Sequence, residues 1–278
     1  MTFGARALIR LGALKHNLAA IRRAAPGSKV MAVVKANAYG HGLVPVAQHL
    51  TDADSFAVAR VPEAVELRAA GIEKPIVLLS GALTGAELAE ALAQQFELVV
   101  HCHEQVALLD SAASGATTVW LKFDTGMNRL GFDPAEAAGL IARLRASDRV
   151  RELRLMSHLA SADDVGGAAT RDQLDQFREL VAGFEGSVSI ANTPATLGWA
   201  EIGTLQENSD FRGDQWIRPG VALFGISPFE GRTGAELGLR PVMRFEARLI
   251  AVKPLAEGAR VGYRGRSRAQ QDTTLGIV

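Results

Sequence analysis

The sequence has little of several features, and each scarcity excludes a class of protein. Its 278 residues include a single cysteine, Cys102, so an intrachain disulfide is excluded. Lys and Arg together number 30, as do Asp and Glu, and this balance leaves no net field to attract a polyanion. No run approaches the roughly 18 apolar residues that a membrane span requires. We therefore predict a cytoplasmic protein with no nucleic-acid partner and no membrane association.

Acidic residues are missing from the first 51 positions, which carry seven basic residues. An Arg-rich, acid-poor, amphipathic start is also typical of an organelle transit peptide. The basic residues continue, however, to Lys35 inside an apolar, strand-like pattern, and the start lacks the uninterrupted apolar region of a secretory signal. We therefore favour a start that belongs to the folded protein.

What the sequence does contain is a repeated alternation of strand-like and helix-like segments. Continuous Val/Ile/Leu runs, as at 30–34 and 76–79, are typical of parallel strands buried on both faces. Eight strand–helix units match a (β/α)8 TIM-type barrel. An open doubly wound sheet is the competing fold, but no Gly-rich dinucleotide turn follows any predicted strand. The predicted strands are 29–36, 55–60, 76–81, 97–102, 117–124, 153–159, 187–192 and 216–225, and the predicted helices include 12–25, 85–95, 134–145 and 170–184.

The pattern changes after the eighth predicted strand. Alternation without helix covers 239–252, a turn is predicted at 254–258, and another strand begins at 274. About 40 β-rich residues are too few to close a core of their own. We therefore expect a barrel at 1–238 followed by the beginning of a mainly β C-terminal domain at 239–278, cut before that domain is complete.

A lysine ends the first predicted barrel strand, at the end where barrels carry their active sites. Burial favours the neutral form of an amine, and a neutral amine can form a Schiff base. For Lys35 alone, an amine that merely emerges at a strand end is the simpler interpretation. The string AVVKANAYGHG at 32–42 changes that balance, because it adds an aromatic ring at Tyr39 and two glycines that allow tight turns.

This string resembles the pyridoxal-phosphate attachment motif of alanine racemases, and the resemblance extends over essentially the whole chain. Six motifs in the same order are far more specific than one. The resemblance implies a barrel that binds pyridoxal 5'-phosphate (PLP), a mainly β second domain, and a homodimer with shared active sites. The other five motifs are LKFDTGMNRLG at 121–131, SHLASAD at 157–163, IANTPA at 190–195, RPGVALFG at 218–225 and VGY at 261–263.

The resemblance also implies a reaction, the interconversion of L-alanine and D-alanine. In bacteria such an isomerase supplies D-alanine for the cell wall or serves L-alanine breakdown. Racemisation removes the α-proton from one face and returns a proton to the other, so two bases are needed. By resemblance, Lys35 holds PLP and handles the proton on the D-alanine side, and Tyr263 acts on the L-alanine side. A free phenol titrates near about pH 10, so such a base requires nearby positive charge or hydrogen bonds.

Several basic residues resemble the family's electrostatic network around the cofactor. His158 and Arg218 match the groups near the tyrosine base, and Arg218 also faces the pyridine nitrogen. A guanidinium there disfavours a second cation on the ring and keeps the carbanion short-lived.

Arg129 resembles the residue that contacts the PLP phenolic oxygen and the substrate carboxylate. Lys122 matches a lysine that many members carry as a carbamate, an anion able to orient Arg129. Without the motifs, a surface ion pair for Arg218 and a satisfied strand-end histidine for His158 would be the simpler interpretations.

Phosphate binding requires N–H and O–H donors and a close backbone. By resemblance, Gly220 permits that approach, Val221 donates its amide, and Thr193 and Tyr39 add hydroxyl groups. Asn192 is included among the cofactor-binding residues, but an Asn before Thr-Pro is equally able to cap the following helix.

Two other functions remain open on the residues alone. A related family binds PLP in a barrel without a second domain and without catalysis, but Tyr263, Arg129 and the start of a β domain favour the racemase. A fold-related amino-acid decarboxylase is disfavoured, because a His-Val-Gly-Ser-Gly-type segment is missing before the phosphate loop.

Two further features carry less weight. His101 and His103 could face one side of a strand as metal ligands, but no third ligand is evident, and we predict no metal site. The segment 203–215 is longer and more polar than the family usually has, and we interpret it as a surface insertion.

Overall fold

A computed structural model describes residues 4–203, 205 and 209–278, and it divides into two compact units. The barrel unit spans Leu11–Val242. The β unit joins the N-terminal strand to Met243–Val278. This division differs from the predicted boundary at 238/239, and the first strand, expected with the barrel, belongs to the β unit because it pairs with the strand that begins at Met243.

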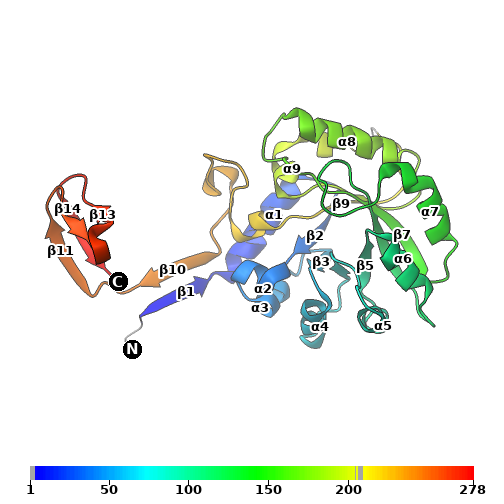
Figure 1. Ribbon diagram of the computed structural model, residues 1–278, viewed down its shortest axis with the longest axis horizontal. Coiled ribbons are helices and arrows are strands. Elements are labelled where there is room, and N and C mark those ends of the chain that lie inside the picture. The colour runs from blue at the N-terminus through cyan, green and yellow to red at the C-terminus, as the bar shows by residue number, and fades with distance from the viewer. Residues whose placement is uncertain (1–3, 204, 206–208) are drawn as a thin grey trace. The chain divides into compact units, whose positions relative to one another are not determined.

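The barrel unit contains a closed parallel barrel in which each strand pairs with the next and the last pairs with the first, which confirms the predicted fold class (Figure 1). Lys29 lies beside Trp216 where the barrel closes. The eight strands are β2 (Lys29–Val33), β3 (Ser55–Val58), β4 (Ile76–Leu78), β5 (Glu97–Val100), β6 (Thr117–Lys122), β7 (Val150–Met156), β8 (Val188–Ser189) and β9 (Gln215–Ile217).

Helices follow the strands and surround the barrel (Figure 1). Two of the helices, at Val61 and Gly85, begin with residues typical of helix starts. The Thr84 hydroxyl accepts the Glu87 N–H at 3.2 Å, and Pro62 lies in the first turn of its helix. The helices are α1 (Leu11–Ala24), α2 (Lys35–Gly40), α3 (Leu43–His49), α4 (Val61–Ala69), α5 (Gly85–Ala93), α6 (His103–Asp110), α7 (Ala137–Arg145), α8 (Ala168–Val181) and α9 (Thr193–Gly198).

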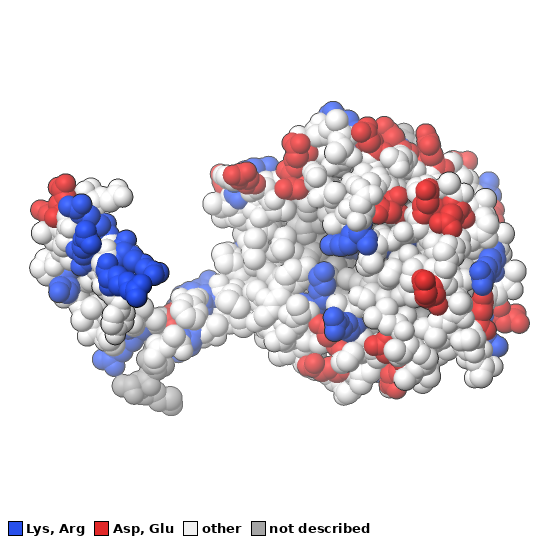
Figure 2. Space-filling model, viewed as in Figure 1, with Lys and Arg blue, Asp and Glu red and all other residues white. Residues whose placement is uncertain are grey.

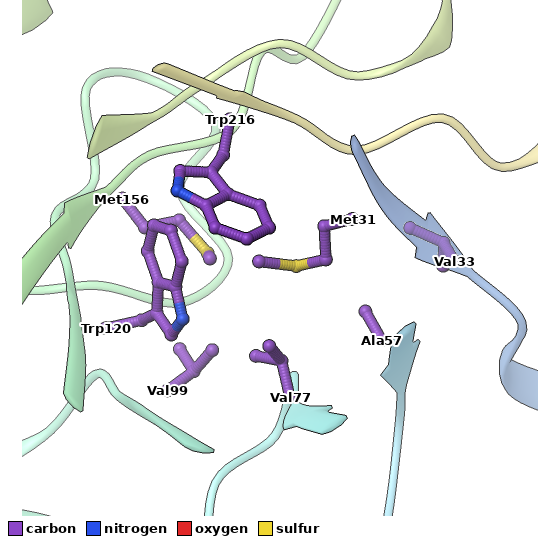
Figure 3. Close-up of a cluster of buried hydrophobic side chains, with 8 residues drawn as sticks. All are labelled: Met31, Val33, Ala57, Val77, Val99, Trp120, Met156 and Trp216. Atoms are coloured by element: carbon purple, nitrogen blue, oxygen red, sulfur yellow. The ribbon is translucent and has the colours of Figure 1, made fainter. Parts of the chain in front are cut away.

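Side chains fill the inside of the barrel, so it is a packed core rather than a pore. Trp120 and Trp216 meet edge to face, with ring centroids 5.9 Å apart, among Met, Val and Ala side chains (Figure 3). The Arg154 guanidinium lies 5.1 Å and 5.4 Å from the two indole rings, and Glu97 accepts the Trp120 indole N–H at 2.7 Å. Arg154 also lies 3.3 Å from the Glu97 carboxylate, so these two interior charges are paired.

Several strands are shorter at their carboxyl ends than the apolar pattern predicts. The first ends at Val33 instead of 36, and the last ends at Ile217 instead of 225. Pro219 lacks an N–H for the sheet, and 221–224 forms a 3₁₀ turn. These apolar residues are buried in loops at the mouth of the barrel, which is why their composition resembles that of strands.

The β unit consists of three antiparallel pairs. The pairs are β1 (Ala5–Ile9) with β10 (Met243–Ala247), β11 (Ala251–Leu255) with β14 (Thr273–Ile277), and β12 (Arg260–Val261) with β13 (Ser267–Arg268). The predicted turn at 254–258 therefore begins later, because Pro254 and Leu255 still belong to a strand.

The predicted surface insertion at 203–215 lies partly outside the described residues, at 204 and 206–208. Within the described part, Leu205 and Phe211 are buried, whereas Gly203, Asp210 and 212–214 are exposed, so the segment lies at the surface and is anchored by apolar side chains. Among the described residues, none of the helices combines the length and hydropathy needed to cross a membrane.

Candidate active site

A cavity of about 400 Å³ opens at the carboxyl ends of the barrel strands. Figure 2 shows basic side chains gathered at a hollow on this unit. The lining includes ten of the eleven residues that the sequence nominated, and all ten belong to the barrel unit: Lys35, Tyr39, Lys122, Arg129, His158, Asn192, Thr193, Arg218, Gly220 and Val221.

Each of these residues lies at or just after the carboxyl end of a barrel strand, which explains why they meet. Lys35 follows β2 by two residues, Lys122 ends β6, and Arg218 follows β9 directly. The carboxyl ends of parallel barrel strands all lie at one face, so residues far apart in sequence converge there.

Lys35 begins a turn with unusual backbone geometry. The four residues after it, from Ala36 to Tyr39, have φ values between 52° and 54°, the left-handed region that L-residues avoid. Two side chains of the same segment fix the turn. The side-chain Oδ1 of Asn37 accepts the Leu43 N–H at 2.8 Å. His41 Nδ1 donates to the backbone carbonyls of Ala38 and Tyr39 at 3.1 and 3.0 Å. The turn therefore holds Lys35 and Tyr39 against the same cavity.

Tyr39 lies against the loop that follows β9. A Cβ at Gly220 would come within 2.4 Å of the Tyr39 hydroxyl, so only glycine allows this approach. The Tyr39 ring contacts Phe224 at 5.1 Å between centroids. Burial raises the pKa of the Tyr39 phenol, so it stays protonated at neutral pH and can donate a hydrogen bond into the cavity.

Arg218 is buried at the floor of the cavity and is held by hydrogen bonds to its surroundings. It donates to the Ser189 hydroxyl and the Ser157 carbonyl, and its Nη2 lies 3.2 Å from His158 Nδ1. Burial lowers the pKa of Arg218 to about 9, which leaves the guanidinium charged at neutral pH.

His158 provides no positive charge to this network. Burial, followed by the charge of Arg218, lowers the pKa of His158 to about 2. Its Nδ1 accepts from Arg218, so the proton of the neutral ring resides on Nε2. The sequence offered His158 and Arg218 together as a source of charge or hydrogen bonds. The structure assigns the charge to Arg218 and a hydrogen-bonding role to His158.

Lys122 and Arg129 occupy opposite ends of one loop. Burial, followed by the charges of Arg218 and Arg129, lowers the pKa of Lys122 to about 8. The loop between Lys122 and Arg129 is shaped by Asp124, whose Oδ1 accepts three successive backbone N–H groups, from Gly126 to Asn128, at 2.9–3.0 Å. Lys122 is therefore partly neutral near pH 8, beside two guanidinium groups.

Asn192 and Thr193 begin α9. The side-chain Oδ1 of Asn192 accepts the Ala195 N–H at 3.2 Å, so this residue caps the helix, as the simpler interpretation of the sequence held. Asn192 also lines the cavity. The Thr193 hydroxyl accepts the Gly220 N–H at 3.0 Å. This bond ties the loop after β8 to the loop after β9.

Sequence reasoning missed Gln173, a buried amide on α8. Its Nε2 donates to the His158 carbonyl at 3.0 Å and to the Thr125 hydroxyl at 3.3 Å, and its Oε1 accepts the Ala160 N–H at 2.9 Å. It thereby connects the loop after β7 to the loop of Arg129. A signal was present, because this polar residue lies on the same helix face as the buried Leu174 and Phe177.

The eleventh nominated residue lies outside the cavity lining, as do the two histidines that were considered as metal ligands. Tyr263 belongs to the β unit, where its side chain is fully exposed. His101 follows the end of β5, whereas His103 begins α6 and lies 2.9 Å from Glu136, so the two histidines do not share a strand face.

Comparison with known proteins identifies the family of the chain. The family model "Alanine racemase, N-terminal domain" matches residues 9–228. The chain belongs to the alanine racemase family. It is 41% identical over 276 residues to alanine racemase from Vibrio parahaemolyticus and 44% identical over 277 residues to that of Shigella boydii. Each alignment covers 99% of this chain and 74% of the relative.

Solved structures of the alanine racemase family share the fold. The biosynthetic alanine racemase from Pseudomonas aeruginosa superimposes with a TM-score of 0.89 and 39% identity, over 99% of this chain and 75% of that one. Alanine racemase from Bartonella henselae, in a crystal structure with covalently bound pyridoxal phosphate, gives a TM-score of 0.79 at 27% identity, over 99% of this chain and 75% of that one.

Proposed function

We propose that the protein is a PLP-dependent alanine racemase that interconverts L-alanine and D-alanine. The observation that carries the proposal is the convergence of a lysine, two hydroxyl donors and a buried arginine on one cavity, in a chain of the alanine racemase family. When bound, PLP supplies an electron sink that makes the α-proton of an amino acid acidic.

The donors around the cavity fit that cofactor. The Tyr39 and Thr193 hydroxyls and the Val221 amide suit a phosphate, and Gly220, which has no side chain, lets the Tyr39 hydroxyl lie close to this backbone. Lys35 would supply the amine that holds the cofactor covalently. Arg218 would face the pyridine nitrogen, and because the guanidinium stays charged, protonation of that nitrogen is disfavoured.

Two residues exchange protons with the α-carbon on opposite faces. Lys35 serves the D-alanine side from the barrel. Tyr263 serves the L-alanine side, and we propose that it enters the barrel of a partner subunit in a homodimer. Its full exposure within its own unit is consistent with a role outside that unit. The charge of Arg218, relayed through the hydrogen bond to His158, favours the phenolate form of such a base.

Arg129 would bind the substrate carboxylate, for which its planar fork of donors is suited. We propose that Lys122 carries a carbamate formed with CO2. A neutral amine is required for this reaction, and the lowered pKa of Lys122 provides one. The product is an anion between Arg129 and Arg218, which replaces repulsion by attraction.

The proposed location is the cytoplasm, in keeping with the single cysteine of the chain.

Borohydride reduction in the presence of PLP, followed by peptide mapping, tests the cofactor assignment. Label on Lys35 is the expected result, and its absence would remove the basis of the proposal. Exchange of the alanine α-proton in deuterium oxide then separates a racemase, which exchanges it, from a protein that only binds PLP.

A further inference from the structure

The turn that carries Lys35 is fixed from outside by one carboxylate. Glu63 lies in the first turn of α4, and its Oε1 accepts the Ala36 N–H at 2.6 Å. Its Oε2 accepts the Ala59 N–H at 2.9 Å and the Arg60 N–H at 3.3 Å. One side chain thus connects the segment after β2 to the segment after β3.

The position of the Ala36 amide gives this contact its importance. Ala36 directly follows Lys35 and is the first of the four left-handed residues. The first N–H groups of a helical turn have no partner inside it, and the Glu63 carboxylate accepts the one on Ala36. Asn37 and His41 fix the later part of the turn, whereas Glu63 fixes its beginning, at the peptide bond next to Lys35.

The chemistry of the side chain is specific to a carboxylate. Glu63 uses both oxygens as acceptors, one toward each segment, and an ionised acceptor strengthens each bond. Glutamine has one oxygen and one NH2 group, so one of the two segments would meet a donor facing a donor. Aspartate keeps the charge but is shorter by one methylene, so it can cap its own helix without reaching Ala36.

We propose that Glu63 is a positioning residue for Lys35. It sets the direction in which the lysine leaves β2, and because Ala59 also lines the cavity, it aligns the neighbouring wall at the same time. The inference rests on the proposed function, since the consequence of misplacing Lys35 is a loss of covalent PLP attachment.

The chain contains a matched control in Glu87, which begins α5 in a similar way. Its Oε2 accepts the Leu83 N–H at 2.7 Å, two residues before the helix starts. All its acceptor contacts that the structure gives are local to α5. Substitution of Glu87 therefore reproduces the loss of a helix-capping carboxylate without touching the turn of Lys35.

The experiment compares wild-type protein with Glu63→Gln, Glu63→Asp and Glu87→Gln. Three quantities are measured: thermal stability of the protein without PLP, affinity for PLP from its visible absorption, and the fraction of Lys35 labelled after brief exposure to PLP and borohydride. Both Glu63 variants should lose about tenfold or more in PLP affinity and labelling rate, the effect of one charge-assisted hydrogen bond. Glu87→Gln should retain both, because it removes a capping charge while its remaining amide oxygen can still accept the Leu83 N–H.

Two results would overturn the inference. One is a Glu63→Gln protein that binds and labels like wild type. The other is a Glu87→Gln protein that is impaired as strongly, because the effect would then follow from stability alone. A wild-type protein that fails to label Lys35 is a separate outcome, and it overturns the proposed function together with this inference. Glu63→Asp keeps the test open if the glutamine variant fails to fold.

Discussion

The barrel unit and the β unit contain similar apolar side chains but differ in how they cover them. Every residue of strands β3, β4, β5 and β6 is buried. In the β unit, Phe245, Ile250 and Val252 are 71%, 75% and 60% exposed. A closed parallel barrel surrounded by helices pairs its own backbone hydrogen-bonding groups and buries its own apolar side chains. Three two-stranded ribbons can do neither completely.

The same division applies to the proposed chemistry. In the barrel unit, several hydrogen bonds hold Arg218, and others fix the turn that carries Lys35. Tyr263 in the β unit is fully exposed. One proposed base therefore has its geometry fixed within a single unit, and the other must obtain it from contacts beyond its own unit. Four predictions break or sharpen this contrast.

The largest effect is expected from the two proposed bases. Lys35→Ala should abolish both covalent PLP attachment and alanine racemisation. Tyr263→Phe should lower the racemisation rate by about 10²–10⁴-fold, the usual contribution of a general base, while PLP attachment is unchanged. Racemisation followed by polarimetry and PLP followed by absorption separate the two losses.

Mixing the two variant proteins tests whether one site uses both subunits. If Tyr263 serves a partner's barrel, random mixing of Lys35→Ala with Tyr263→Phe subunits should restore about a quarter of the wild-type activity, because half of the dimers then hold one intact site. No recovery after verified subunit exchange would place both bases in one subunit and remove the contrast drawn above.

The second prediction compares two phenylalanines. Phe56 in β3 is 1% exposed, and Phe56→Ala should reduce the free energy of unfolding by about 3–5 kcal/mol. Phe245 in β10 is 71% exposed, and Phe245→Ala should cost less than about 1 kcal/mol. Urea unfolding of both variants measures the difference. An equally large loss at Phe245 would reveal that this face is covered in solution.

The sequence predicted the barrel well because its strands are buried on both faces. All eight predicted strands exist, and α1 begins and ends one residue before its predicted bounds. The error lies at the carboxyl ends, where apolar loops such as 221–224 continue the strand composition. The strand β1 was assigned to the wrong unit because its partner, β10, lies more than 230 residues later, a pairing that local patterns do not encode.

Ordered motifs identified the candidate site residues, but they did not predict which groups those residues contact. No local pattern reveals that Glu63 reaches Ala36, or that Gln173 connects two loops, because each bond joins segments that meet only in the fold. The neutral state of His158 also depends on its burial beside Arg218.

The third prediction concerns Lys122, whose pKa of about 8 in the folded protein lies below the ordinary value of 10.5. At pH 7 both states are protonated and the folded state bears the full penalty of the buried charge. As the pH rises from 8 to 10.5, the folded state is neutral while the unfolded state still holds its proton, so the penalty disappears. Lys122→Met should therefore add about 2–3 kcal/mol to the free energy of unfolding at pH 7 and progressively less above pH 8.

Carbon dioxide provides the control for that prediction. Without CO2, wild type should be less stable than Lys122→Met at pH 7. Bicarbonate should stabilise wild type only and add the mass of one CO2 to the intact protein in native mass spectrometry, a gain that Lys122→Met lacks. Equal stabilities in CO2-free buffer at pH 7, with no mass gain in bicarbonate, would contradict both the buried charge and the carbamate.

The smallest effect is expected at the left-handed turn. Ala36 has φ of 54° and is exposed, so glycine fits there without a clash. An L-residue in this region costs about 1–2 kcal/mol, and glycine loses about 0.5–1 kcal/mol of backbone entropy instead. Ala36→Gly should therefore raise the free energy of unfolding by about 0.5–1 kcal/mol. Ala19→Gly, at an exposed position inside α1, should lower it by about 1 kcal/mol. If both substitutions destabilise equally, the turn stores no strain, and Lys35 owes its position to hydrogen bonds alone.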